Sequence, residues 1–241
     1  MSLPLFLVDA LPAGATYRLD GAEGHHAATV QRLRPGERLI LSDGSGGLVS
    51  AEIAAAGKGV LDLALGERRQ VPPARPRLVV AQGIAKSDRG ELAVQAMTEV
   101  GVDEIVAWSA ARSVARWNDQ RPLERWRATV REAAKQARRA WVPVVAPAVT
   151  TAALARRVGA PGVALAVVLH EEATTRLSTM DLPASGEIVL VVGPEGGVAP
   201  EELAVLAAAG AVAARLGTEV LRTSTAGVAA LSVLAARLGR W

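Results

Sequence analysis

Three short loops hold the residue types that could bind a ligand and carry out chemistry. The first, Val192-Gly193-Pro194-Glu195-Gly196-Gly197, lies between an expected buried strand and an expected helix. Glycine lets a backbone approach a ligand closely, and α/β proteins bind ligands where parallel strands end. A simple turn is the alternative, but a turn needs one glycine and this loop has three. Its spacing fits neither a dinucleotide fingerprint nor a Walker loop, so we expect another kind of ligand.

The second loop, 216–226, places Arg222 immediately before a helix that is expected to begin near Thr223. A positive charge at a helix N-terminus is electrostatically unfavourable. A residue that breaks a local rule is a candidate for function, and the alternative is an arginine that points into solvent. We therefore expect Arg222 to act in the site.

The third loop follows the apolar run Val163–Leu169 and begins with His170-Glu171-Glu172. One histidine beside two glutamates could indicate a metal, but no other histidine lies near it and the chain has no cysteine. A protein metal cage needs several such ligands. We therefore expect no metal, and we expect His170 to line a pocket at a polar strand end.

The elements that must position these loops change in character along the chain. In residues 1–70, short apolar runs separated by glycine-rich turns predict a small β-barrel, with one short helix from about 25 to 32. Residues 71–76 contain three prolines and predict an extended linker. From residue 77 onward, alternating strand and helix patterns predict an α/β domain with a mainly parallel sheet. The expected strands are 3–8, 37–41, 47–53, 60–65, 78–84, 105–108, 163–169, 188–192 and 211–216.

Four helices are expected in the second part of the chain. One begins at Asp88, in an arrangement similar to a capping box with Glu91, and ends at Gly101. Another begins with Pro200 at its first position and acidic residues in its first turn. The remaining two span 122–139 and 223–238. The apolar residues that follow Asp88 at helical spacing are Leu92, Ala96, Met97 and Val100.

The positive charge is concentrated in the middle of the chain. Residues 71–150 contain 13 basic and eight acidic residues, whereas the parts before and after each have a net charge of −1. Arginine supplies 24 of the 27 basic residues, and its guanidinium binds phosphate through two hydrogen bonds and stacks on bases. A solvated helix face is the alternative to a surface that follows a nucleic-acid backbone. The expected cationic stripe of the helix 122–139 consists of Arg127, Arg131, Lys135 and Arg138.

Other basic residues are expected near the same ligand. Lys86 and Arg89 belong to the charged turn Lys86-Ser87-Asp88-Arg89. A smaller basic patch is expected on the barrel, where the alternative for the two histidines is a helix start with one solvated ring. The patch consists of His25, His26, Arg32 and Arg34.

The composition excludes several classes of protein. The 241 residues are 50% apolar and 21% charged, which is ordinary for one or two globular domains and unlike a disordered chain. The absence of cysteine excludes disulfides and thiol nucleophiles. No apolar run reaches the roughly 18 residues that span a bilayer, and the first residues lack a basic signal-peptide region. We therefore expect a cytoplasmic protein with no membrane span.

Several segments together resemble the bacterial 16S ribosomal RNA uridine-N3 methyltransferase family (the RsmE family) of the SPOUT superfamily. The resemblance covers nearly the whole chain in the expected order. Its most specific parts are Gly193–Gly197 and Leu221-Arg222-Thr223 with Thr225-Ala226. The chain departs from the family's pattern at Val198 and Ser224, so a carboxylate at position 224 is not expected to be essential. The other matching segments are 24–26, 30–32, 43–47, 86–89, 95–102, 112–114, 132–136 and 216–217.

The resemblance implies a fold and a cofactor. It implies a PUA-like, RNA-binding barrel over residues 1–70, a linker over 71–76, and a SPOUT methyltransferase domain with a trefoil knot over 77–241. It implies S-adenosylmethionine bound in the knot loops and a homodimer packed through the knot region. The expected cofactor-binding residues are Leu169, His170, Val192, Gly193, Glu195, Gly196, Gly197, Leu216, Gly217, Val220, Leu221, Thr223 and Ala226. The expected RNA-binding residues are the basic residues named above together with Arg112 and Arg139.

The implied reaction is the methylation of N3 of a specific uridine in the 16S ribosomal RNA of the small subunit. Uridine N3 carries a proton that must leave, so a base or a cation beside the developing anion would help. We expect Arg222 to contact the uracil or its charge, and Glu195 to act as an acid or base or to shape the cofactor site. Two alternatives remain: a SPOUT enzyme acting on another RNA nucleotide, and a non-catalytic RNA-binding or ribosome-assembly protein.

Overall fold

The computed structural model describes residues 3–86 and 88–241, and the chain divides into two compact units. The first unit comprises Met1–Pro73 and Ala134–Val142, and the second comprises Ala74–Ala133 and Pro143–Trp241. Ser87, which belongs to the charged turn singled out from the sequence, lies outside the described residues. Among the described residues, no helix is both long enough and apolar enough to span a bilayer.

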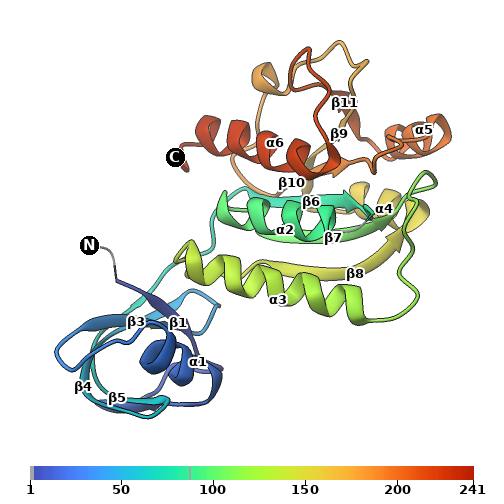
Figure 1. Cartoon of the computed structure of the whole chain (residues 1–241). Helices are drawn as coiled ribbons and strands as arrows, with labels where there is room; N and C mark the ends of the chain where they lie inside the picture. Colours follow the sequence, from blue (N-terminus) through green and yellow to red (C-terminus); the bar gives the residue numbers. More distant parts are fainter. Residues whose placement is uncertain (1–2, 87) are drawn as a thin grey trace. The chain divides into compact units, whose positions relative to one another are not determined.

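The first unit is built on a curved sheet of five described strands in the order β1-β3-β4-β5-β2 (Figure 1). β1 runs parallel to β3, and the other neighbouring strands are antiparallel. Alternate side chains of a strand point to the same face, and Leu39, Leu41, Ile53, Leu61 and Leu63 fill the core in this way. The strands are β1 (Leu5–Leu7), β2 (Thr16–Leu19), β3 (Arg38–Ser42), β4 (Gly47–Gly57) and β5 (Val60–Gln70).

The helix of the first unit begins earlier than the sequence predicted. α1 spans Gly21–His25 and continues as a π-helix over His26–Val30, whereas a start after Gly24 was expected. A Cβ atom at Gly24 would lie 2.5 Å from the carbonyl oxygen of Leu19. Gly24 therefore lies inside the helix because the backbone packs closely there, and it does not mark the helix start.

Residues 134–142 belong to the first unit, although the sequence placed them in the second domain. The backbone explains this difference, because Val142 N donates to Gly44 O and Gly46 N donates to Ala140 O, both at 2.9 Å. The indole nitrogen of Trp141 also donates to Val71 O at 2.9 Å. The turn before β4 thus holds this distant segment in place.

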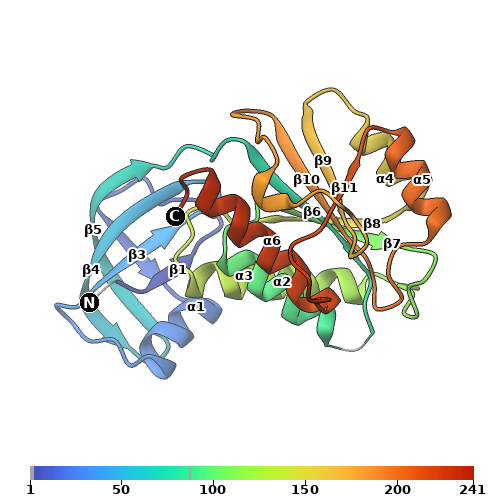
Figure 2. The ribbon, with the colours of Figure 1, turned by 90° about the horizontal axis from the view of Figure 1, so that it is seen from above.

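The second unit contains a fully parallel sheet, as the alternating pattern predicted. Its described strands follow the order β11-β9-β10-β6-β7-β8. Figure 2 shows α2, α3 and α6 on one face and α4 and α5 on the other. Burial on both faces explains the continuous apolar runs of the central strands. The strands are β6 (Arg77–Gly83), β7 (Glu104–Ser109), β8 (Val144–Thr150), β9 (Val163–Leu169), β10 (Glu187–Val192) and β11 (Val212–Ala214).

The helices of the second unit are α2 (Arg89–Glu99), α3 (Arg121–Gln136), α4 (Thr151–Val158), α5 (Pro200–Ala208) and α6 (Thr223–Arg237). α4 and β8 were not predicted. Pro147 lies within β8, which pairs only with β7 in the described structure, and proline is tolerated on an edge strand because it lacks an N–H group. The sequence of β8 therefore lacks the continuous apolar run from which the other strands of this sheet were predicted.

α2 begins and ends as expected but buries a different face. Gly101 adopts a φ of +100° directly after the helix, which suits a glycine stop. Asp88 occupies the N-cap position, yet its side chain makes no capping hydrogen bond, so the expected capping box is wrong. Leu92 is 55% exposed. The buried residues of α2 are Gly90, Ala93, Val94, Met97 and Thr98.

A charge network joins the amino-terminal ends of the central strands. Glu104 on β7 pairs with Arg77 at 2.8 Å and with Arg157 of α4, and its side chain is 8% exposed. Glu187 on β10 pairs with the same two arginines. Burial lowers the pKa of Arg157, but the hydrogen bonds and charges of Glu104 and Glu187 raise that pKa by more. Arg157 therefore keeps its charge on folding.

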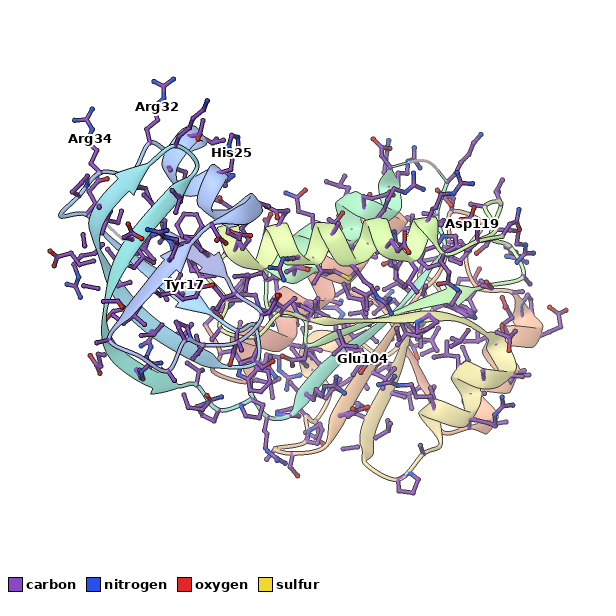
Figure 3. All side chains as sticks on the ribbon, turned by 90° about the horizontal axis from the view of Figure 1, so that it is seen from below. Tyr17, His25, Arg32, Arg34, Glu104 and Asp119 are labelled. Atoms are coloured by element: carbon purple, nitrogen blue, oxygen red, sulfur yellow. The ribbon has the colours of Figure 1, made fainter. Side chains whose placement is uncertain are left out.

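We expect Glu104→Gln to lower the free energy of unfolding by about 2 to 3 kcal/mol, because two guanidinium groups lose a buried partner. The loss is limited because both guanidinium groups remain partly in water. Urea unfolding followed by circular dichroism measures it. Asp119→Asn is the control, because the Asp119–Arg121 pair is exposed (Figure 3). Equal losses in the two variants would contradict the assignment.

Candidate active site

A cavity of about 680 Å³ lies where β9 and β10 end and α6 begins. All three loops singled out from the sequence line it, and its volume is typical of a cofactor site. Of the residues predicted to act in the site, those that line this cavity are Leu169, His170, Val192, Gly193, Glu195, Gly196, Gly197, Val220, Leu221, Arg222, Thr223 and Ala226.

The two other predicted cofactor residues line an adjoining hollow. Leu216 and Gly217 border a space of about 80 Å³ that shares Leu169, His170 and Val220 with the main cavity. The loop after β11 therefore contributes to both spaces. The structure thus brings the whole predicted set together at one end of the sheet.

The loop 193–197 is closely packed around its first glycine. A Cβ atom at Gly193 would lie 3.1 Å from the carbonyl carbon of Gly197. A Cβ atom at Gly83, the last residue of β6, would lie 2.5 Å from the nitrogen of Pro194. The sequence signalled the first glycine but not the second. Glycine at both positions lets the loop fold against the end of the neighbouring strand.

The hydroxyl group of Thr223 connects this loop to the first turn of α6. Thr223 Oγ1 donates to Gly193 O at 2.7 Å and accepts from Gln82 Nε2 at 2.9 Å. Gln82 is fully buried on β6 and was not identified from the sequence, because a single glutamine in an apolar run carries no pattern. Arg222 is the N-cap residue of α6, which begins at Thr223 as expected. The Thr223 side chain links the loop after β10 to β6.

Glu195 is held by the turn that follows β6. Its Oε1 atom accepts a hydrogen bond from the backbone nitrogen of Lys86 at 3.0 Å. This contact fixes the carboxylate at the cavity wall and joins the loop after β10 to the turn before α2. The geometry favours the site-shaping role among the two roles expected for Glu195.

A buried carboxylate, unlike the exposed Glu195, supports the wall of the cavity. Glu202 is 6% exposed, and it accepts hydrogen bonds from Ala111 N at 2.9 Å and from the Thr151 hydroxyl at 2.6 Å. The sequence indicated only an acid in the first turn of α5, which gave no sign of burial. Next to Ala111, the guanidinium of Arg112 donates to Gly196 O at 3.1 Å. Glu202 therefore positions the segment that carries Arg112.

Three arginines line the cavity. Arg89 and Arg112, which were expected to bind RNA, line it together with Arg222. The Arg222 side chain is exposed, and no carboxylate of the described chain pairs with it, whereas its carbonyl accepts from Thr225 N and Ala226 N. Glu171, Glu172 and Glu195 also line the cavity, so its wall carries both signs of charge. Among the described residues, no group of three potential metal ligands is present.

The predicted cationic stripe of α3 is not one surface. Arg127 and Arg131 are exposed, although Arg127 also donates to Val145 O. Lys135 pairs with Glu23 at 2.9 Å and is only 10% exposed. Helix α3 ends at Gln136, and Arg138 has a φ of +53°, so Arg138 and Arg139 lie beyond the helix. The stripe is therefore wrong beyond Arg131.

On the barrel, His25, Arg32 and Arg34 point into solvent (Figure 3). His26 is half-buried, packs edge-on against Phe6 with 6.2 Å between ring centroids, and contacts Gln31. The alternative expected for this pair, one solvated ring at a helix, therefore fits the geometry. Lys86 is exposed in the turn after β6.

Comparison with known proteins agrees with both units. A family described as an RNA methyltransferase domain matches residues 72–235, and one described as an RNA methyltransferase PUA domain matches residues 19–65. Among solved structures, a ribosomal RNA small subunit methyltransferase E from Neisseria gonorrhoeae, bound to S-adenosyl methionine, has a TM-score of 0.88 and 28% identity over 98% of each chain.

Two further proteins are similar over nearly the whole chain. A methyltransferase from Legionella pneumophila, solved with its cofactor S-adenosyl methionine, has a TM-score of 0.86 and 26% identity over 98% of each chain. The ribosomal RNA small subunit methyltransferase E of Mycobacterium bovis is 50% identical over 98% of this chain and 93% of its own length. The chain therefore belongs to the ribosomal RNA small subunit methyltransferase E family.

Proposed function

We propose that this protein transfers a methyl group from S-adenosylmethionine to N3 of a specific uridine in the 16S RNA of the small ribosomal subunit. The observation that carries the proposal is the cavity of about 680 Å³ at which three strand-end loops meet. Relatives named small subunit methyltransferases, one of them bound to S-adenosyl methionine, support it.

The residues of the cavity fit this cofactor. The amino-acid part of S-adenosylmethionine carries an ammonium and a carboxylate, and the wall offers both glutamates and arginines. Gly193 makes a close backbone contact within the loop 193–197, and the backbone groups of this loop hold the adenine. Bound there, the cofactor supplies an electrophilic methyl group on a sulfonium.

The protein's own residues have two tasks in this proposal. The loops position the uridine for an in-line approach, and positioning alone supplies up to roughly 7–11 kcal/mol in ideal cases. Arg222, whose guanidinium has no acidic partner in the described chain, stabilises the negative charge that develops on the uracil as its N3 proton passes to water. Glu195, fixed by Lys86 N, keeps the wall in shape.

We also propose the finer architecture that the family resemblance implies. The C-terminal segment forms a trefoil knot. The strand order β11-β9-β10-β6 supports the knot. The helix α6, which follows the edge strand β11 along the chain and packs against α2, also supports it. A homodimer forms through this region, where Val212, Val220 and Leu221 are exposed apolar residues. Residues 1–70 together with 134–142 hold RNA, residues 71–76 act as the linker, residues 77–133 and 143–241 carry out the reaction, and the protein works in the cytoplasm.

The first prediction tests the reaction and Arg222 together. Purified protein, labelled S-adenosylmethionine and small subunits from a strain that lacks this modification should yield label in N3-methyluridine, identified by mass spectrometry after digestion. Arg222→Ala should lower kcat about 100- to 1,000-fold, which is the usual effect in other enzymes of removing one hydrogen-bond donor that stabilises the transition state. The KM for the cofactor should not change. Arg156→Ala, at an exposed position in the last turn of α4, is the matched control.

Each other outcome of this assay excludes part of the proposal. Label in a different nucleoside would indicate a methyltransferase for another RNA position. Cofactor binding without label would remove the substrate assignment, and no cofactor binding would favour a non-catalytic RNA-binding protein. Full activity of Arg222→Ala would remove the role given to Arg222.

A second prediction concerns the fit of the cofactor. Gly193→Ala places a methyl group 3.1 Å from a backbone atom, so the loop must shift. We expect the Kd for S-adenosylmethionine to rise about tenfold or more, measured by calorimetry. Gly159→Ala is the control, because its new methyl group would meet Ala209 O at 3.5 Å and Ala155 O at 3.7 Å, which are ordinary contacts outside the cavity. An unchanged Kd in Gly193→Ala would contradict the placement.

A third prediction concerns the barrel. The double variant Arg32→Ala/Arg34→Ala removes two solvent-facing cations, so the slope of log K against log salt for binding to small subunits should become shallower by about 1.5. Filter binding over a range of salt concentrations measures it. Arg18→Ala is the control on the same unit, because Arg18 already pairs with Asp62 at 2.8 Å. The same slope in the double variant and the wild type would exclude a phosphate contact there.

A further inference from the structure

A second cavity, of about 380 Å³, lies beside the N-terminal ends of α2 and α3, which run side by side (Figure 1). None of the residues predicted to act in the site lines it. The residues that carry the argument below are Asp88, Glu91, Arg116, Trp117, Arg125 and Trp126.

We propose that this cavity binds a nucleobase next to the methylated uridine in the RNA. The base stacks on Trp117 and presents N–H groups to the carboxylate of Asp88. This inference rests on the proposed function and deepens it, because it assigns a second RNA contact to the same unit.

Two tryptophans form the wall on which the base stacks. The ring centroids of Trp117 and Trp126 lie 4.9 Å apart at an angle of 86°. Trp126 is 2% exposed and packs under Gly90, where a Cβ atom would lie 3.0 Å from the indole. Trp117 is only half-buried. A fixed indole thus braces a second indole that still reaches the cavity, and aromatic side chains of this kind stack on any base.

Asp88 supplies a hydrogen-bond acceptor without a partner. It occupies the N-cap position of α2 but accepts no capping hydrogen bond, and no side chain of the described residues pairs with it. An ionised carboxylate accepts only, so its match on a base edge is a set of N–H groups. Guanine, adenine and cytosine each present an amino group, whereas uracil presents one N–H between two carbonyls.

The basic residues of the cavity suit the backbone of the same nucleotide. Arg116 donates to Ala110 O at 3.2 Å through one nitrogen, and Arg125 pairs with Glu91 at 3.4 Å. Each guanidinium has further N–H groups, and such groups commonly contact phosphate and sugar oxygens. The cavity therefore combines a stacking wall, a base-edge acceptor and backbone donors.

One turn connects this cavity to the proposed methylation site. Asp88 lines the second cavity, while the next residue, Arg89, lines the first, and Lys86 N is bound by Glu195 of the first. A uridine that leaves its stack for the methylation site unstacks its neighbour, which costs free energy. A stacking partner beside the site offsets that cost.

The test uses the full-length protein and small subunits whose 16S RNA carries each of the four bases at the nucleotides on either side of the methylated one. Trp117→Ala should lower kcat/KM about 10- to 100-fold, the usual effect of losing one base stack, while Trp117→Phe retains most activity. The Kd for S-adenosylmethionine should not change. Trp241→Ala, at an exposed tryptophan outside both cavities, is the matched control.

The dependence on the neighbouring base separates base binding from a structural role. With wild-type protein, the target uridine should be methylated about tenfold more slowly when uracil occupies one flanking position than when a base with an amino group does. Asp88→Asn should remove this preference, since an amide both donates and accepts, and Trp117→Ala should also reduce it.

The outcomes distinguish the two proposals. Active wild-type protein with no base preference, or an unchanged preference in Asp88→Asn, would overturn the nucleobase site. Wild-type activity in Trp117→Ala, or a loss in Trp117→Phe as large as that in Trp117→Ala, would indicate that Trp117 does not stack on a base, and would also overturn it. Wild-type protein that methylates no subunit at all would remove the proposed function, and this inference with it.

Discussion

The arrangement of the site depends on one hydroxyl group, that of Thr223. It joins three segments that are far apart in the sequence, because it donates to Gly193 after β10, accepts from Gln82 on β6 and lies in the first turn of α6. A buried polar group left without its partner costs about 1–3 kcal/mol, so these segments hold one another in a single arrangement. Arg222 precedes Thr223 directly. The position of the proposed catalytic guanidinium therefore follows from a contact made by its neighbour.

The features that the sequence predicted best share a local cause. The parallel sheet, the glycine stop of α2 and the three loops follow from apolar runs, glycines and proline over a few residues, and none of these signals needs knowledge of distant contacts. The individual residues expected to bind the cofactor came from the family resemblance. Family resemblance then supplied the identity of the cofactor and the uridine, which no pattern of hydrophobicity contains.

The features that the sequence did not predict depend on partners far away along the chain. Gln82 and Glu202 are buried polar residues whose role is visible only beside Thr223, Ala111 and Thr151. Lys135 was read as a solvent-facing cation from its helical spacing, yet Glu23, more than a hundred residues earlier, pairs with it. Gly24 was read as a boundary although it marks a close contact. Periodicity predicts the direction in which a side chain points, but it does not predict which distant residue that side chain contacts.

The first unit consists of two separate stretches of the chain, and the ribosome synthesises these stretches at different times. Its turn at Gly44–Gly46 bonds to Ala140 and Val142, which leave the ribosome long after the barrel strands. The nascent barrel is therefore incomplete while much of β6, α2, β7 and α3 is being made. The first turn of α6, which completes the cavity, emerges later still. Both units thus acquire their last native contacts late in translation. A chain that ended after residue 73 would lack residues 134–142 of the first unit as well as the whole second unit.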